Sequence, residues 1–133
     1  MARSAIYTTN TSTPVVSAGS VVPVGVTTRR YGNCIKQDGN TITLCGQGYY
    51  LINISATVTP SAAGTVALSA QKDGVAIIGA TASETVTATA TTTNLSISAI
   101  VRNICGCGNS ILSLALDGVA ATINNLAVTV EKL

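Results

Sequence analysis

The sequence predicts an all-β protein, folded as a sandwich or barrel of short strands. Threonine, valine, alanine, serine and isoleucine dominate its 133 residues, whereas Glu, Lys and Gln, which favour helices, are scarce. Apolar residues alternate with polar residues in one strand-length run after another. Turn-forming residues punctuate these runs at regular spacing, which favours a sandwich or barrel over alternating strands and helices.

The first 33 residues form the least regular part of the sequence. Pro14, Pro23 and a mixture of Val, Thr, Ser and Gly leave only short strand candidates, at residues 5–9 and 21–28. We interpret residues 1–33 as an extended segment with an edge strand and a long connection, which docks to another surface or contacts another protomer. A flexible tail is the alternative interpretation.

The clearest strand begins at Tyr50 and stops at Pro60. One face of it is apolar, and the opposite face carries short polar side chains, as expected when one face is buried. The apolar residues are Ile52, Ile54, Ala56 and Val58, and the polar ones are Asn53, Ser55, Thr57 and Thr59.

Five further runs repeat the same period of two residues. They are Val66, Leu68 and Ala70; Val86, Ala88 and Ala90; Leu95, Ile97 and Ala99; Leu112, Leu114 and Leu116; and Leu126, Val128 and Val130. Turn signals separate the runs, at Asp38-Gly39, Pro60 to Gly64, Asp73-Gly74, Gly106 to Asn109, Asp117-Gly118 and Asn124-Asn125.

The charge pattern argues against nucleic acid and membranes as partners. The seven basic residues are scattered, and only Arg29 and Arg30 adjoin, so no stripe could follow a phosphate backbone. No apolar run approaches the roughly 18 residues that a spanning helix needs. The N-terminus also lacks the apolar stretch of a secretory signal, so we expect synthesis in the cytosol.

The residues that usually carry catalysis are scarce. The absence of histidine excludes Ser-His-Asp and Cys-His arrangements. All three aspartates precede a glycine in a predicted turn, where the carboxylate caps local backbone N–H groups, and only Glu84 and Glu131 remain. We therefore expect no enzyme, no catalytic residue and no cofactor.

Two of the four cysteines, Cys105 and Cys107, lie one residue apart in the stretch NICGCGNS. This spacing is too short for a zinc knuckle, and no histidine completes a ligand set, so we expect no metal site. A bond between the two would close a strained ring. They are either thiols at a turn or groups that meet other cysteines across a subunit contact.

The other two cysteines, Cys34 and Cys45, flank a predicted hairpin. A two-residue turn at Asp38-Gly39 places Cys34 opposite Thr43 and makes Cys45 a diagonal neighbour. Diagonal residues are about 7 to 8 Å apart, too far for a disulfide. Because a bulge would change this register, a Cys34–Cys45 bond stays open.

Three stretches of the sequence resemble the tumour-necrosis-factor and complement-globular-head superfamily, and most of all its bacterial and phage branch. That branch includes domains of collagen-like exosporium glycoproteins and small structural proteins of phages that infect Gram-positive bacteria. The stretches are Gly48-Tyr49-Tyr50, VALSAQKDGVAIIGATASET and LSISAIVRNICGCGNSILSLALDGVAATINNLAVTVEKL, and the resemblance covers about residues 40 to 133.

The resemblance implies a jelly-roll sandwich of about ten antiparallel strands, placed at residues 34–133, that assembles as a homotrimer. Tyr49, Tyr50 and Leu51 are then candidates for the trimer interface. Only 9% of the residues are charged, which leaves sheet edges poorly protected and independently favours oligomerisation. The chain has no collagen repeat and lacks the aromatic-rich core of the cytokine members.

These observations favour a non-enzymatic structural protein, a trimeric capsid decoration or head-fibre protein of a phage virion, assembled in the host cytoplasm. Its partners would be two further copies and the major capsid protein or another virion protein, with Arg29 and Arg30 as candidate capsid contacts. One alternative is a subunit of an extracellular or spore-surface filament cross-linked by cysteines. Another is a fibre-tip module that binds a carbohydrate or receptor.

Overall fold

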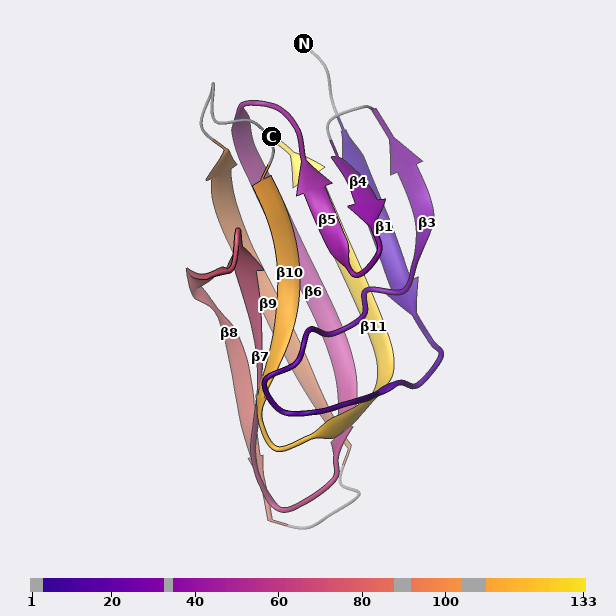
Figure 1. The fold of residues 1–133 in the computed structure, drawn as a ribbon, viewed down its shortest axis with the longest axis vertical. Coiled ribbons are helices and arrows are strands. Elements are labelled where there is room, and N and C mark those ends of the chain that lie inside the picture. Colours follow the sequence, from indigo (N-terminus) through magenta and orange to yellow (C-terminus); the bar gives the residue numbers. More distant parts are fainter. Residues whose placement is uncertain (1–3, 33–34, 88–91, 104–109) are drawn as a thin grey trace.

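The computed structural model describes residues 4–32, 35–87, 92–103 and 110–133, which form two sheets (Figure 1). Sheet A has the strand order β3-β1-β11-β6-β9, with β2 on the edge of β11, and sheet B has the order β4-β5-β10-β7-β8. The strands of sheet A are β1 Ala5–Asn10, β2 Val15–Val16, β3 Val26–Tyr31, β6 Gly48–Pro60, β9 Thr93–Asn103 and β11 Ala121–Lys132. Those of sheet B are β4 Ile35–Asp38, β5 Thr41–Leu44, β7 Gly64–Lys72, β8 Val75–Val86 and β10 Ser110–Gly118.

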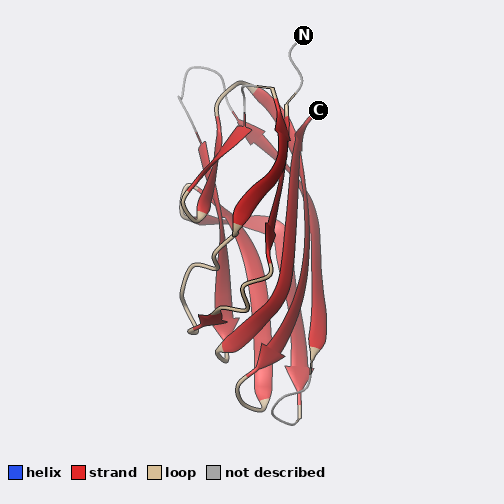
Figure 2. Ribbon diagram, turned by 90° about the vertical axis from the view of Figure 1, so that its right-hand side faces the viewer, coloured by secondary structure: helices blue, strands red, loops and turns tan. Residues whose placement is uncertain are grey.

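The two sheets face each other as the layers of a sandwich (Figure 2). Each pairing within them is antiparallel. The predicted all-β jelly-roll sandwich is therefore confirmed, with eleven strands in the described residues where about ten were expected. Strand β1 begins and strand β11 ends at the same end of the sandwich, which we call the termini end (Figure 1).

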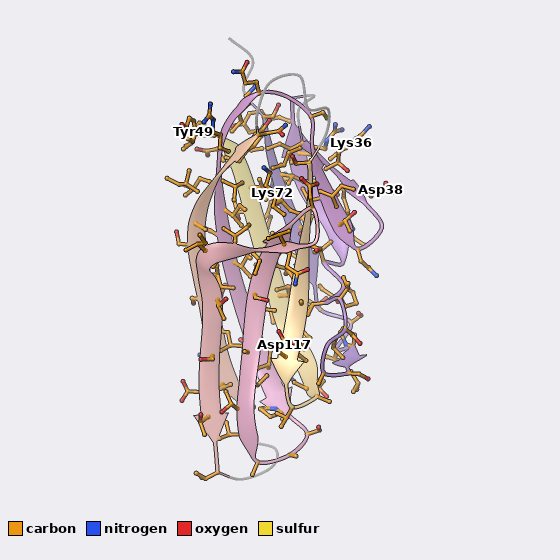
Figure 3. The ribbon with its side chains drawn as sticks, turned by 60° about the vertical axis from the view of Figure 1, so that its left-hand side comes forward. Lys36, Asp38, Tyr49, Lys72 and Asp117 are labelled. Carbon is orange, nitrogen blue, oxygen red and sulfur yellow. The ribbon has the colours of Figure 1, made fainter. Side chains whose placement is uncertain are left out.

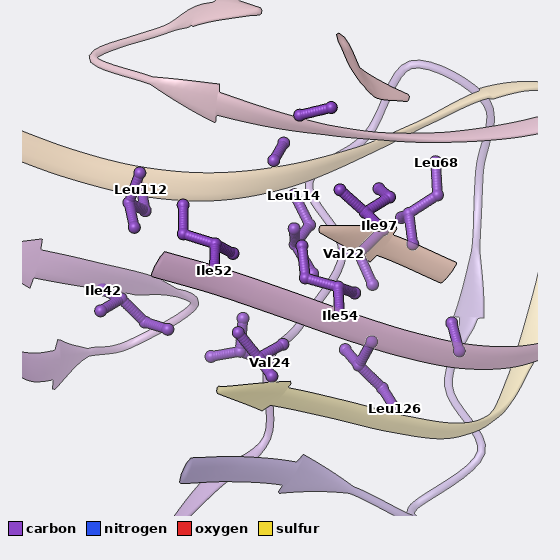
Figure 4. Packing of buried hydrophobic residues seen from close by; sticks show 14 of the residues in the cluster. Val22, Val24, Ile42, Ile52, Ile54, Leu68, Ile97, Leu112, Leu114 and Leu126 are labelled. Atoms are coloured by element: carbon purple, nitrogen blue, oxygen red, sulfur yellow. The ribbon is translucent and has the colours of Figure 1, made fainter. Parts of the chain in front are cut away.

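Alternating side chains of the long strands fill the space between the sheets. In β6 the residues from Tyr50 to Val58 at every second position are at most 3% exposed, as the period of two predicts. Figure 4 shows Ile52 and Ile54 of this strand among core residues from both sheets. The predicted alternation in 66–70, 95–99, 112–116 and 126–130 likewise places its apolar residues in or against the core.

The N-terminal residues are integrated into this sandwich more closely than the sequence indicated. Strand β1 pairs with β11 on one side and with β3 on the other, so it lies inside sheet A. The edge is β3, whose six residues are all exposed. Ile6 contributes to the core, so residues 4–32 do not form a flexible tail.

The connection between β2 and β3 crosses from one sheet to the other. Val22 donates a backbone hydrogen bond to the carbonyl of Leu114, and Gly19 donates one to Leu116. These bonds cover the part of the β10 edge that the short strand β5 leaves open. Val22 and Val24 then fill the gap between the sheets, at 0% and 1% exposure.

Two of the predicted turns need correction. The β4–β5 hairpin pairs Ile35 with Leu44 and Asp38 with Thr41, so its loop is Gly39-Asn40 and the predicted register is wrong by two. The diagonal spacing that disfavoured a Cys34–Cys45 bond came from the wrong register, so the bond stays open, and Cys34 itself lies outside the described residues. The predicted turn at Asn124-Asn125 is a bulge inside β11, where the register to β6 shifts.

The turn at Asp73-Gly74 is confirmed. Lys72 pairs with Val75, and both turn residues have positive φ, at 53° and 82°, as a two-residue hairpin loop requires. Strand β8 then begins far earlier than predicted, and of the expected strand from Val86 to Ala90 only Val86 belongs to it among the described residues. Ala88 and Ala90 lie outside the described residues.

Candidate functional site

The outward surface of sheet A carries the residues that alternate with the core positions, and we call it the sheet A face. The strand register arranges these side chains in rows across the sheet. One row joins residues of all five long strands, in the order Tyr31, Ala5, Glu131, Leu51 and Ile100. The next row towards the centre of the sheet holds Arg29, Tyr7, Thr129, Asn53 and Ser98.

Large apolar and aromatic side chains gather on this face near the termini end. Tyr49, Tyr31 and Ile100 are 52%, 56% and 58% exposed, and Tyr7 is 37% exposed. Single exposed apolar residues are ordinary, but several that share neighbouring rows of one sheet form a patch. Such a patch is typical of a protein–protein contact.

Farther from the termini the same face is lined by small side chains. It contains a shallow hollow of about 380 Å³. The outward-facing residues around this hollow are Asn53, Ser55, Ser96, Ser98, Ala127 and Thr129. No aromatic ring of the described residues lines the hollow, which therefore offers no stacking surface of the kind that sugar sites usually have.

The three residues predicted for the trimer interface, Tyr49, Tyr50 and Leu51, do not all lie on the same side of sheet A. Tyr49 and Leu51 lie on the sheet A face, and the Tyr49 ring lies below the guanidinium of Arg102, 5.9 Å from its centre. Tyr50 points into the core, is 0% exposed, and donates a 2.7 Å hydrogen bond to the Gly46 carbonyl. Tyr50 is therefore unsuited to a subunit contact, because successive side chains of a strand point to opposite faces and Tyr50 points to the face opposite Tyr49 and Leu51.

A second hollow of about 350 Å³ lies where β8 and β9, the last strands of their sheets, meet near the termini end. We call it the β8–β9 notch. Among the described residues, apolar side chains line it together with two cations and no acid. The lining residues are Lys72, Val75, Ala76, Ile77, Ile100, Val101 and Arg102. Figure 3 labels Lys72 and Tyr49, which lie in the same half of the molecule.

The two adjacent arginines lie on the edge strand β3. Arg30 is held by a 2.7 Å hydrogen bond from its Nε to the Ile35 carbonyl of β4. Arg29 stands on the sheet A face opposite Tyr7. Both are exposed, which is compatible with a contact to another surface.

Of the four cysteines, only Cys45 lies within the described residues, where it is half-buried after β5. Cys34, Cys105 and Cys107 lie outside them. Asn103, at the end of β9, is hydrogen-bonded to the turn that follows Cys45, because its Nδ2 donates to the Gly46 carbonyl at 2.9 Å. Ser110 Oγ in turn donates to Asn103 Oδ1 at 2.7 Å, and both residues are buried.

The carboxylates of the described part of the chain are spread over several strands and turns. The Asp73 carboxylate accepts a 2.9 Å bond from the Ile111 N–H of β10, so it joins two strands and does not cap its own turn as predicted. No group of three His, Cys, Asp or Glu side chains within the described ranges could hold a metal ion. Nor do these ranges include a helix long and apolar enough to cross a membrane.

Sequence reasoning missed most of the sheet A face. Tyr7, Tyr31, Ile100 and Glu131 come from four different strands, and only the strand order brings them into adjacent rows. One signal was present in the sequence. Leu95, Ile97 and Ala99 form the apolar face of their strand, and Ile100 is an apolar residue on its other, polar face. An apolar residue on an otherwise polar strand face indicates a second contact surface.

Comparisons with known proteins support the fold. No protein-family model matches the chain, and no curated protein sequence matches it. Among solved structures, murine APRIL at pH 5.0 aligns with a TM-score of 0.77 at 12% identity, covering 98% of this chain and 99% of that one. The globular domain of zebrafish complement 1qA protein aligns with a TM-score of 0.69 at 12% identity, over 97% and 95% of the two chains.

A third similar structure is the PRD1 vertex protein P5. It aligns with a TM-score of 0.65 at 18% identity, covering 98% of this chain and 96% of that chain. Over nearly the whole of its length, this chain thus has the jelly-roll fold shared by tumour-necrosis-factor-like, complement-head and vertex proteins. At these identities the likeness establishes the fold alone.

Proposed function

We propose that this jelly-roll protein is a non-enzymatic structural protein that forms a homotrimer on the surface of a phage virion. In that role it would be a capsid decoration or head-fibre protein, assembled in the host cytoplasm. The observation that carries the proposal is the patch of tyrosines and isoleucine on the sheet A face, beside a hollow lined by small residues.

The patch supports assembly because its exposed side chains have a large apolar area. Tyr31, Tyr49 and Ile100 are each more than half exposed in the single chain. Burying an aromatic or branched aliphatic side chain contributes about 1.5 to 3 kcal/mol, so covering these three with a second copy provides a substantial driving force. Tyrosine suits such a surface because its ring is apolar and its hydroxyl tolerates water.

The virion location is supported by two likenesses. The sequence resembles the bacterial and phage branch of the superfamily in the G-x-Y strand and in the closing segment. The fold is similar to that of PRD1 P5, whose name describes it as a vertex protein. In this proposal Arg29 and Arg30, exposed on the edge strand β3, contact the capsid protein together with other residues of 1–33.

A virion test measures whether the chain is bound to the particle. Particles purified from lysed host cells should contain the chain at a fixed ratio to the major capsid protein, measured by quantitative mass spectrometry. Purified trimer carrying Arg29→Glu and Arg30→Glu should rebind stripped particles less than the unchanged trimer, with Lys36→Glu as a control for charge. Finding the chain only in the particle-free supernatant would contradict the virion location.

A further inference from the structure

Glu131 is the only acid among the described residues of the sheet A face, and its surroundings are apolar. In its row it lies between Ala5 and Leu51, with Tyr31 and Ile100 one strand farther out on either side. Glu131 forms no ion pair within the described part of the chain. An acid that is covered by an apolar contact without a partner destabilises that contact by several kcal/mol. If the face is covered, a cation must therefore reach Glu131.

The β8–β9 notch contains the cations that the row around Glu131 lacks. Lys72 and Arg102 line the notch, while the apolar walls come from Val75, Ile77 and Ile100. The two cations form no ion pair with described residues. The Tyr49 ring lies 5.9 Å from the Arg102 guanidinium and favours one orientation of that side chain. The group that complements this notch is a carboxylate flanked by apolar side chains.

We infer that Glu131 of one copy of this chain enters the β8–β9 notch of the next copy and pairs there with Arg102 and Lys72. The inference rests on the proposed homotrimer and names the contact that holds it together. The face and the notch are different surfaces, so the contact is head-to-tail, and head-to-tail contacts close into rings when the rotation allows it.

The strand register makes this contact possible in a ring. Glu131 and Ile100 both pair with Leu51, so they lie at the same height along the strands. Rotation about an axis parallel to the strands keeps every residue at its own height. Glu131 of one copy therefore meets the notch of its neighbour at the level of Ile100, with Arg102 two residues along the same strand.

Charge exchange tests the pair. Glu131→Arg places a cation against Lys72 and Arg102, and Arg102→Glu places an acid against Glu131. Each single variant should raise the protein concentration at which half of the chains are assembled by at least about tenfold, because like charges meet in a contact that excludes water. The double variant should bring that concentration back to within about tenfold of the unchanged protein, because the attraction is restored in reverse.

Two matched controls separate the pair from a general charge effect. Asp117→Arg reverses an exposed acid on the outer surface of sheet B, and Lys36→Glu reverses an exposed cation on β4. Both should leave assembly unchanged, and circular dichroism should show that all variants keep the fold. Sedimentation velocity over a range of protein concentrations gives the readout.

The outcomes distinguish the inference from the proposed function. If the unchanged protein is a monomer at every concentration, the homotrimer itself fails. If it is a trimer and both single variants assemble as well as it does, the trimer stands and the Glu131 contact is overturned. The contact is also overturned if the single variants dissociate and the double variant stays dissociated.

Discussion

Replacing Asn103 with alanine removes the amide that joins the end of β9 to the turn before β6. Asn103 is 2% exposed, and its side chain donates to Gly46 at 2.9 Å and accepts from Ser110 at 2.7 Å. Each of these bonds contributes about 0.5 to 1 kcal/mol, and leaving the buried Ser110 hydroxyl without an acceptor adds about 1 to 2 kcal/mol. Because the Gly46 carbonyl keeps the Tyr50 hydroxyl as a donor, we expect a loss of about 2 to 4 kcal/mol.

This loss converts into a large thermal shift. The entropy of unfolding is about 0.28 kcal/mol/K for a chain of this length, so Asn103→Ala should lower the Tm by about 7 to 14 °C. Thermal unfolding followed by circular dichroism measures it, at one fixed protein concentration because assembly raises the Tm by mass action. Asn94→Ala is the matched control, since Asn94 is an exposed asparagine on the same strand and should change stability by less than about 0.5 kcal/mol.

A double-mutant cycle isolates the bond itself. Ser110→Ala alone should also destabilise, but Asn103→Ala and Ser110→Ala together should cost about 1 kcal/mol less than the sum, because no orphaned hydroxyl remains. A Tm shift below about 3 °C for Asn103→Ala, or strict additivity in the cycle, would refute this account of the buried bond.

Three further substitutions test the fold. Thr8→Val should raise the Tm, because the Thr8 Oγ1 is buried without a hydrogen-bond partner among the described residues and valine has the same shape; a lower Tm would show that the hydroxyl has a partner. Gly118→Ala should destabilise by more than 1 kcal/mol in denaturant titrations, since φ is 86° and a Cβ would lie 1.9 Å from the Thr65 carbonyl oxygen; an unchanged midpoint would contradict that. Tyr50→Phe should lose about 1 kcal/mol for its bond to Gly46 yet leave the mass of the assembly unchanged, so dissociation would place Tyr50 at the interface after all.

Strands that bury one face were predictable from the sequence because burial imposes a period of two. From Tyr50 to Val58 every second residue is in the core, as the pattern indicated. Strand β8 was not predictable, because as an edge strand it exposes most of both faces and its residues 77–80 stay outside the pairing with β7. A turn was predicted at Asn124-Asn125, where the structure has a bulge, because residues that favour a turn also favour a bulge.

The site was less predictable than the fold because it is assembled from distant segments. The resemblance indicated Tyr49 and Leu51, and the structure puts both on the sheet A face. It could not indicate Glu131, which becomes the isolated acid of an apolar row only through pairing with Ala5 and Leu51. Val22 and Val24 also reach the core from the connection between β2 and β3, where only a short strand candidate was predicted.

The mass of the purified chain in solution tests the central claim most directly. Light scattering in the presence of reductant should give three times the chain mass of 13.3 kDa, at concentrations well above the midpoint of assembly. A trimer that persists in reductant, with the same mass without it, would show that non-covalent contacts and not disulfides hold the copies together. A monomer in both conditions would contradict the trimer, and large species that collapse on reduction would favour the cysteine-linked filament.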